Sequence, residues 1–326
     1  MSDTSEQKID EITTRLHRLE DAIARLTTNV GNLTQGLASV SQDTLFSQVA
    51  YLGDHRALTY LRNGQKIFVD TRSVDIGTHI LFGGTWEPNY MAAFARQVRS
   101  GDTVLDIGAN HGIYALAAGM QVGPKGHVYA FEASLHFSEL IRASISINGL
   151  DNVVSVINSA VAATTGEAVL SFDDHWSGGG HLAMPADLEG TPSPAGPGRV
   201  PQPLGLPQKL KTEKVRCVAL DEYFPDPAMT VDVIKMDIEG AEGVALKGMA
   251  KILERSHRIK IMMEFCPLMM SNFDCNAIDA IAMLEAGGFM CWTINSDSSL
   301  APARWPALLE APDTIRNVLV SRQNVA

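Results

Sequence analysis

Strand-like and helix-like segments alternate along the chain from residue 101 onward. Short apolar runs typical of strands occupy residues 103–107, 127–131, 153–157, 231–236, 259–265 and 289–294. Helical spacing of apolar residues follows at 113–121, 134–148, about 241–254 and about 275–287. When each strand reaches the next through a helix, the strands lie parallel and helices cover both faces of the sheet. The sequence therefore predicts an α/β fold with a mostly parallel sheet.

The first forty residues carry a different repeat. Apolar residues alternate at spacings of three and four, and they are Ile9, Ile12, Leu16, Leu19, Ile23, Leu26, Val30, Leu33, Leu37 and Val40. This spacing is the seam of an α-helical coiled coil. Ile and Leu occupy both seam positions, and the hexapeptide RLHRLE (15–20) resembles the R-h-x-x-h-E motif of short trimeric coiled coils. We predict an oligomerisation helix over 1–44, as a parallel trimer or, next, a dimer. The alternative is an amphipathic helix that packs on its own domain.

Two further segments complete the expected organisation. Residues 45–100 read as a connector with short strands at Leu58–Leu61 and Lys66–Asp70, leading into an α/β domain over 101–326. The stretch 184–208 is rich in Pro and Gly and interrupts that domain. We interpret it either as a surface insertion or as a lid that contacts a substrate.

Composition excludes several classes of protein. The formal net charge is −11, and no stripe of basic residues compensates for it, so nucleic acid is not expected as the main partner. The polar, acidic N-terminus is unlike a signal peptide, and no apolar run reaches the length of a membrane span. The four cysteines form no CxxC pair, which is typical of a reduced compartment. A cytoplasmic protein is the expectation.

The stretch VLDIGANHG (104–112) is the first chemistry-bearing segment. A buried strand ends at Asp106, and Gly108 and Gly112 follow in a G-x-x-x-G spacing. This is not the G-x-G-x-x-G of a dinucleotide site, which argues against an NAD-dependent oxidoreductase, and no phosphate-binding GK[ST] occurs. A carboxylate before such a loop would repel a pyrophosphate and attract an ammonium or a sulfonium. The loop is therefore suited to a cationic ligand without phosphates, although an ordinary strand–helix turn would also tolerate these residues.

Carboxylates also end the later strands. Glu132 follows the second strand, where its two oxygens could accept both hydroxyls of a ribose, or where it could cap the next helix. Asp237, Glu239 and Glu242 follow the fourth strand, and of these we expect Asp237 or Glu239 to be functional and Glu242 to be structural. Glu264 ends the segment IKIMMEF. Because parallel strands end at one sheet edge, these side chains are predicted to meet there.

Taken together, these blocks resemble a known family. VLDIGANHGIYALA, HVYAFEAS, INGLDNV, VALDEYF, VIKMDIEGAEGVALKGM and IMMEF occur in order, and Trp86-Glu87-Pro88 precedes them. The chain resembles the FkbM family of S-adenosylmethionine-dependent methyltransferases over residues 55–295. The resemblance implies a Rossmann-like class I methyltransferase fold and S-adenosylmethionine as the cofactor. It covers neither the coiled coil nor the Pro-rich insertion.

The resemblance also implies roles for individual residues. The methionine side of the cofactor would contact Asp106, Gly108, Asn110 and Gly112, Glu132 would hold the ribose, and Glu87 would approach the cofactor's charged end. Asp237 and Glu239 would face the acceptor. Family members mostly methylate hydroxyls of sugars or of polyketide-type metabolites, so a sugar-containing acceptor in a glycan or glycosylated metabolite is expected.

Methyl transfer to an alcohol requires removal of the hydroxyl proton. Candidate bases are Asp237, Glu239, Glu264 and a histidine, either His181 in SGGGHL or His175 in DDHW, which we place on a loop. The carboxylates could instead bind Mg²⁺, which would orient and acidify a hydroxyl. Two function classes therefore remain. One is an active O-methyltransferase whose stalk gathers several sites and docks a partner enzyme of glycan synthesis. The other is an inactive scaffold whose coiled coil organises a complex.

Overall fold

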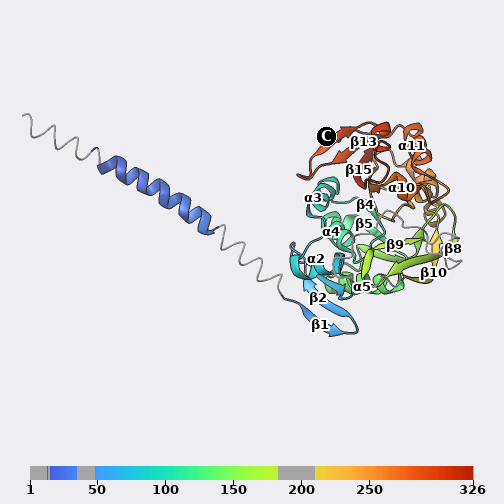
Figure 1. Cartoon of the computed structure of the whole chain (residues 1–326), viewed down its shortest axis with the longest axis horizontal. Helices are drawn as coiled ribbons and strands as arrows, with labels where there is room; N and C mark the ends of the chain where they lie inside the picture. Colours follow the sequence, from blue (N-terminus) through green and yellow to red (C-terminus); the bar gives the residue numbers. More distant parts are fainter. Residues whose placement is uncertain (1–12, 14, 35–47, 183–209, 326) are drawn as a thin grey trace, which may run out of the picture. The chain divides into compact units, whose positions relative to one another are not determined.

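The computed structural model describes residues 13, 15–34, 48–182 and 210–325. The chain divides into two compact units, 1–48 and 49–326 (Figure 1). In the first unit, residues 15–34 are helical. The seam residues of this helix are between 54% and 67% exposed, and they are Leu16, Leu19, Ile23, Leu26, Val30 and Leu33. The rest of the predicted stalk and the insertion 184–208 lie outside the described residues.

An eight-stranded sheet forms the centre of the second unit, in the order β14-β13-β15-β12-β11-β4-β5-β6. Five neighbouring strands are parallel: β12 (Lys260–Phe265), β11 (Val233–Met236), β4 (Thr103–Ile107), β5 (His127–Glu132) and β6 (Val154–Asn158). The other three strands pair antiparallel: β15 (Arg316–Ser321), β13 (Met290–Ile294) and β14 (Leu300–Ala303). The prediction of a mostly parallel sheet is confirmed.

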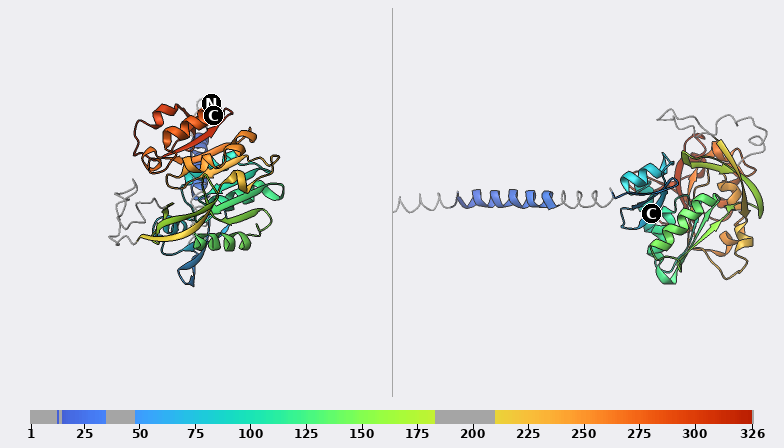
Figure 2. Two further views of the ribbon diagram at one scale, coloured as in Figure 1. Left: turned by 90° about the vertical axis from the view of Figure 1, so that its right-hand side faces the viewer. Right: turned by 90° about the horizontal axis from the view of Figure 1, so that it is seen from below.

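Helices cover both faces of this sheet (Figure 2). Strand residues alternate between two cores, so that Val104 and its neighbour Leu105 belong to different clusters. One core receives α3 (Pro88–Gln97), α4 (Ile113–Val122) and α5 (Leu135–Ile147). The other receives α8 (Glu242–Lys247), α9 (Ala250–Arg255) and α11 (Ala277–Ala286). The helix expected over 241–254 is thus two short helices. A side chain at Gly248, between them, would collide with the carbonyl oxygen of Ala162.

The segment before residue 101 is part of the same compact unit. It contributes the antiparallel sheet β1 (Ala50–Gly53), β2 (Arg56–Tyr60) and β3 (Lys66–Asp70), and the helix α2 (Ile76–Gly83) besides α3. Ile67, Ile80 and Phe94 from this segment are buried in the core that also holds α4 and α5. The structure therefore places no unit boundary at residue 100, since these residues complete the packing of one sheet face.

A second sheet, in the order β7-β10-β8-β9, follows β6. Its strands are β7 (Ala160–Val161), β8 (Gly166–Asp173), β9 (Trp176–Leu182) and β10 (Leu210–Val218). The prediction of a loop at SGGGHL, with His181, is wrong, because these residues lie within β9. Glycine has low strand propensity, so only pairing with β8 reveals this strand.

Short elements complete the unit: α7 (Leu220–Tyr223), α10 (Pro267–Met270), η1 (Gly123–Lys125) and η2 (Trp305–Leu308). Among the described residues, no helix is long and apolar enough to cross a membrane.

Candidate active site

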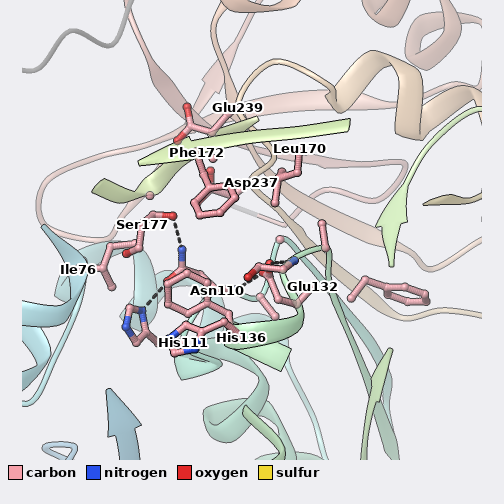
Figure 3. A pocket seen from close by; sticks show the side chains of 18 of the residues that line it. Ile76, Asn110, His111, Glu132, His136, Leu170, Phe172, Ser177, Asp237 and Glu239 are labelled. Atoms are coloured by element: carbon pink, nitrogen blue, oxygen red, sulfur yellow. Dashed lines mark hydrogen bonds between the residues drawn. The ribbon is translucent and has the colours of Figure 1, made fainter. Parts of the chain in front are cut away.

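A cavity of about 270 Å³ lies at the carboxyl ends of β4, β5 and β11. Gly108, Glu132 and Asp237 line it from the central sheet, and Phe172 and Gly178 line it from β8 and β9 (Figure 3). Ligands of open α/β sheets bind beyond the carboxyl ends of the strands, so this is the expected place for a ligand. The second sheet, which sequence reasoning missed, forms the opposite wall.

The loop after β4 needs both of its glycines. Gly108 has φ 76°, and a Cβ atom there would collide with the carbonyl oxygen of Asp237. Gly112 has φ 83°, and its Cβ would lie 3.0 Å from the side chain of Ile141 on α5. The amide of Gly108 donates to the carbonyl oxygen of Phe131 at 3.0 Å, which ties the loop to β5. The G-x-x-x-G spacing thus packs the loop tightly and leaves room for a ligand over it.

Glu132 at the end of β5 is buried and fixed by two backbone amides. Its Oε2 atom accepts from Asn110 N and its Oε1 atom from Ser134 N, both at 2.8 Å. Burial raises the pKa of this carboxyl to about 7, although the two backbone hydrogen bonds act in the opposite direction. Each oxygen retains a lone pair, so Glu132 can still accept hydrogen bonds from hydroxyl groups of a ligand in the cavity.

A buried lysine lies between two of the predicted carboxylates. Lys235 on β11 pairs in register with Asp106 on β4, and its Nζ atom lies 3.9 Å from Asp106 Oδ1 and 3.4 Å from Asp237 Oδ2. The same Nζ donates to the carbonyl oxygen of Gly108 at 3.2 Å and lies 4.9 Å from the ring centre of Tyr114. The sequence analysis overlooked Lys235. The signal for it was its place two residues before Asp237, which puts both side chains on one face of the strand.

Asp106 is fully buried, and neither of its carboxylate oxygens accepts a well-formed hydrogen bond. Burial raises its pKa to about 6, although the nearby Lys235 ammonium acts in the opposite direction. A buried carboxylate without a full set of partners is costly. The Lys235 ammonium offsets part of that cost, and Asp106 itself does not line the cavity.

Three carboxylates converge at the other end of the cavity. One oxygen each of Asp237, Glu239 and Glu264 lies within 4.8 Å of the others, whereas Glu132 is not part of this group. Burial, and then the charge of Asp237, raise the pKa of Glu239 and of Glu264. The two glutamic acids therefore stay protonated unless a cation joins them. Carboxylate oxygens at this spacing could hold one divalent ion.

Glu239 also adopts a left-handed backbone with φ 54°, as do Glu87 (43°) and Asn110 (50°). Such conformations cost energy in residues other than glycine and cluster at functional sites. Glu87 accepts a hydrogen bond from the Tyr114 hydroxyl at 3.0 Å. Burial and the charge of Asp237 raise the Glu87 pKa. Glu87 thus lies beside the carboxylates, while its neighbour Trp86 lines the cavity.

The histidines predicted as bases are not brought into the cavity. His181 on β9 does not line it, and its Nδ1 atom lies 3.2 Å from the carbonyl oxygen of Gly179. His175 lies in the turn between β8 and β9, where its Nδ1 is 3.2 Å from Asp173. The two predicted histidines are therefore not candidate bases. Two histidines that the prediction did not name, His111 and His136, line the cavity instead, and His136 Nε2 lies 2.8 Å from Asp70 Oδ2 (Figure 3).

Hydrogen bonds hold the second sheet over the loop after β4. The Nδ2 atom of Asn110 donates to the carbonyl oxygen of Ser177 on β9 at 2.6 Å (Figure 3). The carboxylate of Asp75 accepts from the amides of Ser177 at 3.2 Å and Gly178 at 2.8 Å. Asn110 therefore contacts both walls, through its backbone to Glu132 and through its side chain to β9.

Residues 106–291 match the family model of the methyltransferase FkbM domain. The chain belongs to the FkbM methyltransferase family. It is a methyltransferase that depends on S-adenosylmethionine, and its α/β sheet is that of a class I methyltransferase. The residues present suit this cofactor, because the Gly108 backbone lines the cavity and the buried Glu132 carboxylate at the end of β5 can accept hydrogen bonds from ribose hydroxyls.

Similarity to individual proteins is more limited. A protein-L-isoaspartate O-methyltransferase of Ignicoccus hospitalis is 33% identical over 78 residues, which cover 23% of this chain and 37% of that protein. The match therefore spans well under half of that relative. An S-adenosylmethionine-dependent O-methyltransferase of Thermotoga maritima superimposes with a TM-score of 0.36 at 12% identity, covering 86% of this chain and 87% of that one. TYW2 of M. jannaschii, solved with AdoMet, gives 0.39 at 13% identity, covering 84% and 87%.

Proposed function

We propose that this FkbM methyltransferase transfers a methyl group to a hydroxyl of a sugar in a glycan or glycosylated metabolite. The observation that supports this best is one continuous cavity, in which Glu132 lines one part and Asp237 and Glu239 line another. A polyol acceptor offers several hydroxyl donors to these carboxylates. An acceptor that is itself anionic would be repelled by the same groups.

Bound S-adenosylmethionine supplies an electrophilic methyl group on its sulfonium. The negative charge of Asp106, behind the cavity wall, would attract the ammonium of the cofactor, and Glu132 would accept hydrogen bonds from the ribose. Asp237 faces the Lys235 ammonium at 3.4 Å, and we assign to this carboxylate the removal of the acceptor hydroxyl proton. Protonated Glu239 and Glu264 would donate hydrogen bonds to neighbouring sugar oxygens.

A second candidate route uses a metal ion. Asp237, Glu239 and Glu264 offer three oxygens within 4.8 Å of one another, and Mg²⁺ would orient vicinal hydroxyls and lower the pKa of one of them. Titrating MgCl₂ and MnCl₂ into the protein by calorimetry distinguishes the routes. Saturable binding that Glu264→Gln abolishes supports the metal, whereas no binding, together with full activity in chelator, leaves Asp237 as the base.

The substrate proposal is tested with a panel of acceptors. Purified protein, S-adenosylmethionine and neutral, amino and acidic saccharides would be incubated together, and methylated products identified by mass spectrometry. We expect a methyl ether on a neutral or amino sugar, and no product with Asp237→Asn. Methyl transfer to nitrogen or to a carboxylate, or only to acidic saccharides, would contradict the proposal.

We also propose that the N-terminal helix assembles the chain into a parallel trimer, with a dimer as the next choice. Its exposed seam, including Leu19 and Ile23, is apolar surface that a second and third copy would bury. Assembly would present several active sites to a polymeric acceptor and could dock a partner enzyme of glycan synthesis. The alternative, an inactive scaffold, is disfavoured because a scaffold has no use for the costly buried carboxylates Asp106 and Glu132.

The cytoplasm is the proposed location. The four cysteines Cys217, Cys266, Cys275 and Cys291 are all buried and carry free thiols. This is consistent with a reducing compartment. Localisation of a tagged chain by cell fractionation tests it.

A further inference from the structure

A second hollow, of about 810 Å³, lies at the opposite end of the central sheet from the active-site cavity. It is formed where β4, β11 and β12 begin, by the end of α3, the residues before those strands, the turn at 298–300 and residues 323–325. Four cationic side chains line it: Arg96, Arg99, Arg258 and Lys260. For a chain with a net charge of −11, this is an unusual concentration of positive charge.

The two carboxylates in the hollow offset the charge of these cations only in part, and both of them act on Lys260. Asp102 accepts a hydrogen bond from the backbone amide of Arg99 at 2.7 Å, and Asp232 accepts one from Thr103 N at 3.0 Å. Both carboxylates thus hold the backbone at the start of β4. Within the described part of the chain, no carboxylate forms an ion pair with any of the four cations. Four positive charges face these two negative ones and the exposed Asp297 carboxylate near Arg96, so the hollow keeps a net positive charge.

The cations that have partners contact neutral groups. Arg96 donates to the carbonyl oxygen of Ser298 at 2.8 Å, and Lys260 donates to that of Gln97 at 3.1 Å. These bonds orient the side chains without cancelling their charge. Burial and the nearby guanidinium groups of Arg99 and Arg258 lower the pKa of Lys260, so the positive charges disfavour one another. An anion placed among them would remove that penalty.

We propose that this hollow is a binding site for a phosphate-bearing anion, separate from the methyl-transfer site. Guanidinium groups bind phosphate oxygens through paired, charge-assisted hydrogen bonds. Arg99 and Arg258 come from different chain segments and face the same space, so they can contact two sides of one diphosphate. The neutral side chains of Ser299, Gln323 and Asn324 around them offer further hydrogen-bonding groups.

The test is a calorimetric titration of inorganic pyrophosphate into the full chain at constant ionic strength. We expect saturable binding that the double variant Arg99→Ala/Arg258→Ala weakens at least tenfold. The matched control, Lys214→Ala/Arg216→Ala on β10, removes the same charge from exposed residues elsewhere and should change the affinity less than twofold. Affinity for S-adenosylmethionine, measured on the same samples, should be unchanged in both, which separates this site from the proposed active site.

Two results would overturn the proposal: no saturable binding to the unaltered chain, or an equal loss of affinity in both double variants. Arg258→Gln alone provides a milder change, with a several-fold loss expected. A parallel titration with UDP-glucose identifies the source of the anion. Tighter binding of UDP-glucose than of pyrophosphate assigns the site to a diphosphate carried by a nucleotide sugar, and equal or weaker binding assigns it to the free anion.

Discussion

The backbone amide of Asn110 donates a hydrogen bond to Glu132 Oε2 at 2.8 Å. The loop after β4 is therefore held by the same carboxylate that faces the cavity from the end of β5. Asn110 can make this bond because its backbone is left-handed, with φ 50°. Cofactor affinity and loop conformation should consequently depend on one another.

Replacing Glu132 by alanine should weaken binding of S-adenosylmethionine at least tenfold, about 1.4 kcal/mol. The variant loses the ribose acceptor and the anchor of Asn110 together, whereas Glu132→Gln retains an acceptor and should lose less. Calorimetric titration measures both. Glu139→Ala, an exposed glutamate on α5, is the control. Equal affinities for Glu132→Ala and Glu139→Ala would remove Glu132 from the cofactor site.

Without cofactor, stability should fall as the pH rises from about 5 to about 8. Burial raises the pKa of Asp106 to about 6 and those of Glu132 and Glu242 to about 7. At pH values between the ordinary and the raised pKa values, the folded state binds more protons than the unfolded state. The free energy of unfolding is therefore largest below the ordinary pKa values and decreases as the pH rises through the raised ones.

Urea unfolding across this pH range tests the sign. Glu242 accepts backbone hydrogen bonds from Ile238 and Gly240. Glu242→Gln should reduce the change in the free energy of unfolding over this pH range, by on the order of 3 kcal/mol at most. Stability that rises with pH over the same interval would contradict the burial of these ionisable groups.

S-Adenosylmethionine should bind more tightly at pH 8 than at pH 5.5. Ionised Asp106 attracts its ammonium, and the pKa of this carboxyl lies at about 6, so this group alone should raise the affinity by about fourfold between the two pH values. The control is Asp106→Asn, in which binding should be weaker and only the titration of Glu132, whose pKa lies at about 7, should remain. A pH profile for Asp106→Asn that equals that of the unaltered protein would assign the titration to other groups.

Gly108→Ala should destabilise the protein by on the order of 4 kcal/mol, because backbone strain and overpacking add. The new Cβ would collide with the carbonyl oxygen of Asp237 at φ 76°. Gly64→Ala is the matched control, since Gly64 has φ 85° with no atom within 4 Å of the added Cβ. It should cost only about 1–2 kcal/mol. Equal losses of unfolding free energy in the two variants, measured by denaturant unfolding, would mean that the close approach of Gly108 to Asp237 adds no cost.

Ile23→Lys should dissociate the proposed trimer, because a charge would be placed in the apolar seam. Thr28→Lys lies on the opposite side of the helix and should leave the assembly intact. Light scattering at micromolar concentration gives the mass of each. Deletion of 1–44 should likewise yield monomers that still bind S-adenosylmethionine. A monomeric unaltered chain would reject the stalk as an assembly device.

The sequence by itself determined the elements whose signals are local. The apolar runs at β4, β5 and β12 predicted those strands, and the acidic residues that end them predicted the edge where Asp237, Glu239 and Glu264 meet. Strand alternation and parallel connectivity are enough for this, because the carboxyl ends of parallel strands share one edge. The heptad spacing of the first helix is equally local, although only assembly can bury its seam.

The tertiary structure alone decided how the cavity is enclosed. β9 carries three consecutive glycines, so its strand conformation depends on pairing with β8 and on Asp75 and Asn110, which are distant in sequence. Lys235 acquires its role from register, because pairing β11 with β4 is what places it opposite Asp106. Burial likewise sets which carboxyls keep their protons. These are long-range effects, and of them only the two-residue spacing of Lys235 and Asp237 leaves a trace in the local sequence.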